Sequence, residues 1–311
     1  MGIDRYSSRE KRRLDMRTGT ELLDALSSGR LVLAFQPIRR IDHPGSDACL
    51  YSEVLLRRVD GPLVGGTVRS CSGAIGALER MGRIQQLDFS VLRTVIELLE
   101  KHPDQRLGCN VSAASLRARA LWSPILSYLA ARGDLAQRLT LEITETSAIQ
   151  QGDRELELVA DLRVRGTCIA IDDLGAGFTT FEFLARCRPD VVKIDRAVLL
   201  RACEADAPAG LLGNLARVCA DYSPCIVVEG VETAQELEVV CRSGAQCFQG
   251  FLNAPPDVAP AWLDAAPVVV RRRPASGPPI QRVRAAGDDR TNVPSLFERN
   301  RGSSTRSNRH G

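Results

Sequence analysis

The chain has 311 residues, of which 44% are hydrophobic and 25% charged, and its net charge is +3. This composition is that of a globular protein, and the length accommodates one large domain. The chain contains no uninterrupted apolar run of about 18 residues, so no transmembrane helix is predicted. The charged N-terminus also lacks the apolar stretch of a secretory signal. We therefore expect a cytoplasmic protein without a membrane span.

The two ends of the chain are more basic than the middle. Residues 271–311 hold ten arginines against three acidic residues, and residues 1–20 hold six basic against three acidic residues. A basic segment of low hydrophobicity is typical of a disordered tail, although it can also contact an anionic partner. We expect a basic arm over 1–19, a folded domain over 20–266 and an Arg- and Pro-rich tail over 267–311.

Cysteine and histidine exclude several kinds of site. The ten cysteines are scattered, form no C-x-x-C motif and often stand inside apolar runs, so we expect reduced core residues. None of the three histidines follows a predicted strand. A Ser-His-Asp triad or a histidine-rich zinc site is therefore not expected.

From residue 20 onward, apolar periodicity predicts alternating strands and helices, which is typical of an α/β fold with a parallel sheet. The predicted elements are an amphipathic segment over 20–29, strands over 31–38 and 52–58, a helix over 84–101, a strand over 106–111, a helix over 122–132, a strand over 139–143, a helix over 153–165, strands over 168–172 and 191–194, a helix over 209–221, a strand over 225–229, a helix over 233–243 and a final segment over 247–251.

Four of the apolar runs end in a carboxylate or a lysine. They are LTLEITE (139–145), CIAIDD (168–173), VVKID (191–195) and CIVVEG (225–230). An ionised group is costly to bury unless it is paired or binds a metal. In parallel (β/α) barrels the active site lies at the carboxyl ends of the strands. We therefore expect a single TIM-like (β/α)8 barrel with its site on this rim.

The strand ends bring carboxylates and amides together. Hard oxygen ligands of this kind suit Mg²⁺ or Mn²⁺, and adjacent carboxylates such as Asp172 and Asp173 could serve two ions, a common arrangement for phosphodiester cleavage. Lys193, one of three lysines in the chain, could orient or deprotonate a water molecule. The candidate ligands are Glu53, Asn110, Glu142, Asp172, Asp173, Glu229 and Gln249.

Each of these residues also has a purely structural interpretation. Asp173 could cap a turn at Gly175, and Asn110 could cap the helix that follows it. Lys193 could be the partner of a single nearby carboxylate. The conjunction of all these residues at strand ends favours a site.

The ordered motifs resemble the EAL-domain phosphodiesterases, which hydrolyse the bacterial messenger cyclic di-GMP. The resemblance runs from about residue 20 to 256, and the signature triplet stands as Glu53-Val54-Leu55, with valine in place of the usual alanine. The other motifs are QPI at 36–38, NVS at 110–112, LEITET at 141–146, DDLGAGFTTF at 172–181, KIDR at 193–196, VEGVET at 228–233 and QGF at 249–251.

The resemblance implies metal-dependent hydrolysis of one phosphodiester bond, which gives linear pGpG. It implies two Mg²⁺ or Mn²⁺ ions; Ca²⁺, with its longer and more variable coordination, is expected to bind and inhibit. A homodimer is also expected. The implied catalytic residues are Glu53, Asp172, Asp173 and Lys193, and the implied metal ligands are the seven candidates above. The implied substrate contacts are Gln36, Leu55 and Arg57. The coupling of the site to the dimer interface is assigned to Glu145, Glu232 and the loop 174–180.

The chain departs from the family pattern only around the site. Tyr51 replaces the usual glycine two residues before Glu53, and the other departures are Arg58, Cys71, Ala74 and the Asn253-Ala254-Pro255 ending. The alternative to an active enzyme is a binding module. It would be a catalytically weak EAL domain that binds cyclic di-GMP as a sensor or interaction module. A barrel enzyme acting on sugar phosphates does not explain the NVS, KID and QGF motifs together.

Overall fold

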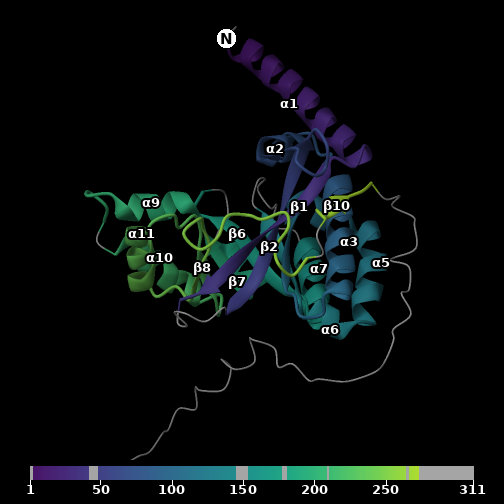
Figure 1. The fold of residues 1–311 in the computed structure, drawn as a ribbon. Coiled ribbons are helices and arrows are strands. Elements are labelled where there is room, and N and C mark those ends of the chain that lie inside the picture. The colour runs from purple at the N-terminus through teal and green to yellow at the C-terminus, as the bar shows by residue number, and fades with distance from the viewer. Residues whose placement is uncertain are drawn as a thin grey trace, which may run out of the picture.

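The computed structural model describes residues 3–41, 48–144, 153–176, 181–208, 210–263 and 266–272. A barrel of strands lies at the centre, helices flank it on both sides, and a long N-terminal helix projects away from it (Figure 1).

Eight strands close into the barrel that the sequence predicts. β1 pairs with both β2 and β9, so the sheet has no free edge between them. Two short strands, β3 (Thr67–Ser70) and β10 (Val269–Val270), extend the sheet beside β2 and β1. The barrel strands are β1 (Leu31–Arg40), β2 (Cys49–Asp60), β4 (Leu107–Ser112), β5 (Leu139–Thr144), β6 (Cys168–Leu174), β7 (Val191–Ile194), β8 (Ile226–Val228) and β9 (Cys247–Phe248).

One strand differs from the predicted parallel sheet. β1 runs antiparallel to both of its barrel neighbours, whereas the pairs from β2 through β4 to β9 are parallel. Parallel neighbours need a crossover of a dozen or more residues. Only residues 41–48 connect β1 to β2, so this pair returns as a hairpin and the barrel is mixed.

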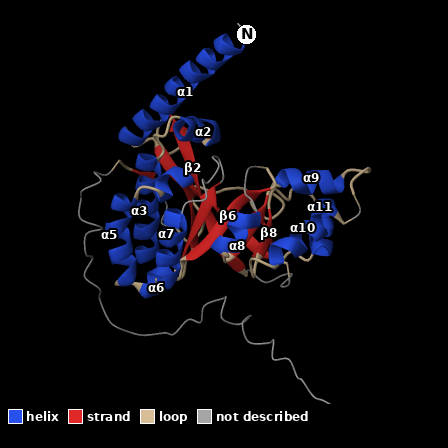
Figure 2. Ribbon diagram, turned by 180° about the vertical axis from the view of Figure 1, so that it is seen from behind, coloured by secondary structure: helices blue, strands red, loops and turns tan. Residues whose placement is uncertain are grey.

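The helices cover the outside of the barrel (Figure 2). Their ends follow the local sequence: Thr233 and Glu236 form a capping box at the start of α11, and Gly244 ends that helix with a positive φ of 83°. The helices are α1 (Ile3–Ser27), α2 (Ser72–Arg80), α3 (Gln85–Lys101), α4 (Ala113–Leu116), α5 (Arg119–Ala130), α6 (Gly133–Ala136), α7 (Asp153–Val164), α8 (Phe181–Cys187), α9 (Arg196–Cys203), α10 (Leu211–Ala220) and α11 (Ala234–Ser243).

The projecting helix α1 is attached to α2 at its C-terminal half. Arg80 makes two hydrogen bonds to Asp15, with Nη2–Oδ1 and Nε–Oδ2 distances of 2.6 and 2.9 Å. A Cβ added at Gly19 would lie 3.0 Å from Leu78 Cδ2, so the backbone of α1 passes directly over the side chains of α2. These contacts hold the two helices together.

The barrel interior carries its own small cluster of buried residues, which we call the interior cluster. Side chains alternate across a strand, so residues two positions apart share a face. The residue two positions before each of Glu53, Asp172, Lys193, Glu229 and Gln249 belongs to this cluster. Its members are Ile38, Leu50, Tyr51, Cys168, Ala170, Val191, Cys225, Val227 and Cys247.

Two elements cross the predicted domain limits. α1 continues through residue 19, and β10 pairs with β1 beyond residue 266. The valine run at 268–270 explains the second case, because β-branched residues favour strands. The division into arm, barrel domain and tail stays a prediction, since residues 273–311 lie outside the described part of the chain. Seven of the ten cysteines are buried, in keeping with the core positions expected for them. No helix among the described residues is long and apolar enough to cross a membrane.

Candidate metal centre and adjoining cavity

The polar residues predicted at the strand ends lie together at the carboxyl end of the barrel. Asn110 on β4 stands beside Glu142 on β5, in register. Asp172 lies on β6 and Lys193 on β7, and Glu229 and Gln249 directly follow β8 and β9. Parallel strands in register therefore gather side chains that are far apart in the sequence.

Lys193 lies at the centre of the carboxylates and is fully buried. Its Nζ donates hydrogen bonds to Glu142 Oε2 at 2.6 Å and Glu53 Oε2 at 3.1 Å. The same nitrogen lies 2.9 Å from Asp172 Oδ1 and 2.7 Å from Glu229 Oε1. The interpretation of Lys193 as the partner of a single carboxylate is therefore wrong. An ammonium group has three donors, so one lysine cannot hydrogen-bond four carboxylates at once.

The two amides both turn their nitrogen atoms toward Glu53. Asn110 Nδ2 donates to Glu53 Oε1 at 2.8 Å, and Gln249 Nε2 donates to Glu53 Oε2 at 2.7 Å. The amide oxygens, Asn110 Oδ1 and Gln249 Oε1, are buried and accept no hydrogen bond from the described residues. Ser112, not Asn110, caps the helix that follows, because its side chain accepts from Ser115 N. Asn110 is thus free of that structural role.

The ionisable groups in this cluster change one another's pKa values. Burial alone would lower the pKa of Lys193, but Asp172, Glu142, Glu229 and Glu53 together raise it well above its usual range. Burial also raises the pKa values of Glu142 and Glu229 well above normal. Glu53 keeps a lowered pKa, because Lys193 and the two amides outweigh its burial. Lys193 therefore stays positively charged, and its charge offsets part of the cost of burying the surrounding carboxyl groups.

Asp173 stands at the outer edge of the cluster in a strained conformation. Its φ of 56° lies in the left-handed region, which is uncommon for residues other than glycine. Its carbonyl oxygen accepts from Ala176 N, so the backbone turns there. Burial, and then the neighbouring Asp172, raise the pKa of Asp173 to about 7. Asp173 takes part in this turn through its backbone carbonyl, and its carboxylate lies with those of Asp172 and Glu229.

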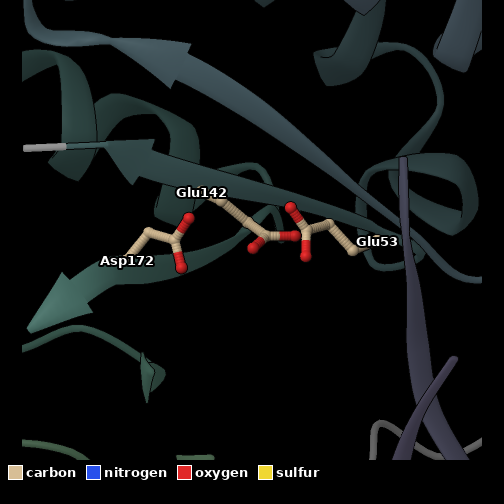
Figure 3. A group of neighbouring side chains, drawn as sticks. All are labelled: Glu53, Glu142 and Asp172. Atoms are coloured by element: carbon tan, nitrogen blue, oxygen red, sulfur yellow. The ribbon is translucent and has the colours of Figure 1, made fainter. Parts of the chain in front are cut away.

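The donor set fits divalent cations. Glu53, Glu142 and Asp172 form one group in which each residue offers an oxygen within 4.8 Å of the others, and Asp172, Asp173 and Glu229 form a second. Figure 3 shows Glu142 between Glu53 and Asp172, with the three carboxylates turned toward one another. The unpaired amide oxygens of Asn110 and Gln249 add neutral ligands of the same hard type. Asp172 belongs to both groups, as a ligand shared by two ions would.

A cavity of about 370 Å³ opens beside this cluster. Asn110, Asp172 and Asp173 line it together with Leu55 and Arg57 on β2. The remaining wall comes from α2 and α3. Arg57 is the cationic side chain among the residues that line the cavity, and burial lowers its pKa without approaching neutrality.

Two predicted residues, Gln36 and Glu232, belong neither to the two carboxylate groups nor to the residues that line the cavity. Gln36 is buried on β1 beside Glu53, its register partner, where it accepts a hydrogen bond from Gln249 Nε2 at 3.1 Å and donates to Ala254 O. Glu232 pairs with Arg196 at 2.9 Å, outside the carboxylate cluster. Glu145 and residues 177–180 of the predicted loop lie outside the described residues.

Sequence reasoning missed Asp88 on α3, which also lines the cavity. One of its oxygens, Oδ2, accepts from Ser112 N at 3.0 Å, Ser112 Oγ at 2.7 Å and Ser115 Oγ at 2.6 Å. Burial raises the pKa of Asp88 to about 6. Asp88 therefore fixes the end of β4, which carries Asn110. The available signal was a carboxylate between Leu87 and Phe89, on the core face of an amphipathic helix.

Comparison with known proteins gives consistent results. Residues 20–256 match the EAL domain family. The chain is 28% identical over 241 residues to the cyclic di-GMP phosphodiesterase NbdA of Pseudomonas aeruginosa, covering 76% of this chain and 30% of that protein. It is 27% identical over 237 residues to the probable cyclic di-GMP phosphodiesterase PdeA of Escherichia coli, covering 75% and 31%. The chain thus spans about a third of the length of these relatives.

Two solved structures are similar over the same region. The cyclic di-GMP complex of the phosphodiesterase PaMucR has a TM-score of 0.64 and 27% identity, covering 78% of this chain and 97% of that one. The manganese and cyclic di-GMP complex of BlrP1 from Klebsiella pneumoniae has a TM-score of 0.57 and 25% identity, covering 73% and 56%. With most of its length matched and its barrel closed in the same way, the chain belongs to the EAL-domain family.

Proposed function

We propose that this protein is a metal-dependent phosphodiesterase that hydrolyses one phosphodiester bond of cyclic di-GMP to linear pGpG. One observation carries the proposal: a complete set of carboxylates and unpaired amide oxygens lies beside a cavity that contains Arg57. The phosphodiesterases NbdA and PdeA support the substrate assignment as relatives of this chain.

Each group in the site has a chemical task in this reaction. The seven ligands proposed from the sequence would hold two Mg²⁺ or Mn²⁺ ions, which supply charge stabilisation at the attacked phosphate when bound. Arg57, which lines the same cavity, would hold a substrate phosphate by charge-assisted hydrogen bonds. Lys193 keeps its proton among four carboxylates. It would orient the attacking water by donating to it, or take a proton from it once metal ions neutralise the surrounding carboxylates.

We also propose four further properties of this protein. Glu145, Glu232 and the loop 174–180 would couple the site to a homodimer interface. Ca²⁺ would bind and inhibit, the basic tail would contact an anionic partner, and the protein would act in the cytoplasm.

The central experiment measures cyclic di-GMP cleavage with Mg²⁺, Mn²⁺, Ca²⁺ or chelator. We expect turnover with Mg²⁺ or Mn²⁺ and none with chelator or Ca²⁺. Glu53→Ala should lower kcat by orders of magnitude, whereas Glu157→Ala, on the exposed face of α7, should not. Full activity in chelator would contradict the metal assignment. Tight binding of cyclic di-GMP by the wild-type protein without cleavage would instead identify a sensor.

A second experiment tests the substrate side of the cavity. Arg57→Ala removes a charged hydrogen-bond donor and should weaken cyclic di-GMP binding by about 1.5–3 kcal/mol, measured by calorimetry with Ca²⁺ present to prevent turnover. Arg154→Ala is the matched control, because Arg154 is exposed on α7. An unchanged Kd in Arg57→Ala would remove Arg57 from the substrate site.

A further inference from the structure

Tyr51 belongs to the interior cluster and lies on β2, the strand that carries Glu53 of the candidate metal centre. It lies two residues before Glu53 on β2, so both side chains face the barrel axis. The ring is 3% exposed, and its neighbours in the cluster include the small residues Ala170, Val191 and Val227. The Tyr51 hydroxyl is buried and has no hydrogen-bond partner among the described residues.

Glu142 presents a matching unpaired atom. Its Oε2 accepts from Lys193, whereas its Oε1 is buried without a partner in the described part of the chain. Tyr51 and Glu142 approach each other beside Gly108. A Cβ built at Gly108 would lie 2.1 Å from Glu142 Oε1 and 2.4 Å from Tyr51 Cε2. The absence of a side chain at Gly108 is what admits both groups to this part of the barrel.

The two atoms are complementary. A phenol keeps its proton at neutral pH, so the Tyr51 hydroxyl has a proton to donate. An unpaired buried polar group is costly, and the terminal torsion of a glutamate is soft. A small rotation, or one bridging water molecule, would therefore join the donor to the acceptor. Carboxylates that bind metals are usually held by such a second hydrogen bond.

We propose that Tyr51 is a positioning residue that donates a hydrogen bond to Glu142 Oε1, directly or through one water molecule, when the carboxylates turn from Lys193 to bound metal. Glu142 Oε1 is then fixed toward the barrel interior, and Oε2 is left for the cation. This inference rests on the metal centre of the proposed function, and it adds a residue that stands where the family usually has glycine.

The experiment compares wild-type protein, Tyr51→Phe and the control Tyr222→Phe. Tyr51→Phe keeps the ring that packs against Gly108 and removes only the hydroxyl. The Tyr222 ring contacts Phe181, and Tyr222 belongs neither to the residues that line the cavity nor to the two carboxylate groups. Mn²⁺ affinity is measured by calorimetry, thermal stability is measured in chelator, and the tyrosine ultraviolet difference spectrum is recorded on Mn²⁺ addition.

We expect Tyr51→Phe to bind Mn²⁺ about 10–100-fold more weakly, the usual cost of losing a group that supports a metal ligand. Its melting temperature in chelator should equal or exceed that of the wild-type protein, because an unpaired hydroxyl has been removed. The Mn²⁺-dependent tyrosine band should be absent in Tyr51→Phe and present in Tyr222→Phe. Equal Mn²⁺ affinity and an unchanged band in Tyr51→Phe would overturn the inference alone. A wild-type protein that binds no Mn²⁺ would overturn the proposed function with it.

Discussion

The barrel strands carry two opposite kinds of chemistry one pleat apart. At the carboxyl rim, Glu53, Asp172, Lys193, Glu229 and Gln249 form a charged and hydrogen-bonded cluster. Two residues earlier, the same strands place Tyr51, Ala170, Val191, Val227 and Cys247 in the interior cluster. The rim and the interior cluster are built on the same strands, so they differ only in their side chains. Packing holds the interior cluster together, whereas the rim depends on balance between one cation and several anions.

The two regions should therefore fail in different ways. Shortening one side chain of the interior cluster leaves a small cavity, and the loss of stability grows with the volume of that cavity. Removing the cation from the rim leaves several buried carboxylates without a partner, which is the more severe loss.

The largest effect is expected for Lys193→Met. Without metal, its free energy of unfolding at pH 7 should fall by about 3–5 kcal/mol, the usual cost of breaking a buried ion pair. Mn²⁺ should restore much of this loss by neutralising the same carboxylates. Cleavage should stay at least about 100-fold below wild type, because the group that orients the water is gone. Urea unfolding in chelator and in Mn²⁺, with a single-turnover assay, measures these effects.

Lys101→Met provides the control for this experiment, because Lys101 is exposed at the end of α3. It should match the wild-type protein in stability and cleavage. Equal stability of Lys193→Met and wild type in chelator would show that the rim does not depend on this cation.

A smaller effect is expected for Asp88→Asn, and it should depend on pH. Asp88 accepts hydrogen bonds but has a folded-state pKa raised to about 6 from 3.8. The folded protein thus binds more protons than the unfolded chain between these values, and the wild type loses stability as pH rises from about 4 to 6. The amide oxygen of asparagine can accept the same bonds without a charge. Relative to Asp88→Asn, wild type should therefore lose roughly 2.4 kcal/mol between pH 4 and pH 7.

Urea unfolding of both proteins in chelator at pH 4 and pH 7 measures the difference, and the other titrating groups cancel in the comparison. A pH-independent difference between them would mean that Asp88 stays ionised in the folded protein.

The smallest effect is expected for Val227→Ala in the interior cluster. The change removes two buried carbon atoms, so the free energy of unfolding should fall by about 2 kcal/mol. Mn²⁺ affinity should stay within about twofold of wild type, because Val227, although it is the register partner of Lys193, supplies no metal ligand and no charge. Urea unfolding and calorimetry check both values. A large loss of Mn²⁺ affinity would show that the two regions are coupled through packing.

The sequence predicts most of the barrel because its strands are β-branched runs separated by turn residues. The strand predictions at 139–143, 168–172 and 191–194 match β5, β6 and β7 closely. The direction of β1 was not predicted, because apolar runs carry no information on direction. Helices α8 and α9 were also missed, since seven or eight residues are too few to show a helical period.

The site divides in a similar way. Carboxylates at strand ends were predictable, because parallel strands in register gather their ends on one rim. The fourfold contact of Lys193 was not, since it depends on distances across the barrel rather than on spacing along the chain. Asp88 was missed for the same reason: its partner Ser112 lies 24 residues away on another element. The roles of Glu145 and residues 177–180 remain predictions.

The attachment of α1 to α2 decides where the chain can be cut. The family match begins at residue 20, which invites a fragment that starts there. Such a fragment would lose Asp15 and the close approach at Gly19, and with them the partner of Arg80. Because α2 supplies Ser72, Ile75 and Gly76 to the cavity, the cut would loosen a wall of the substrate site while leaving every proposed metal ligand in place. A fragment for binding or structural work should therefore begin before Asp15.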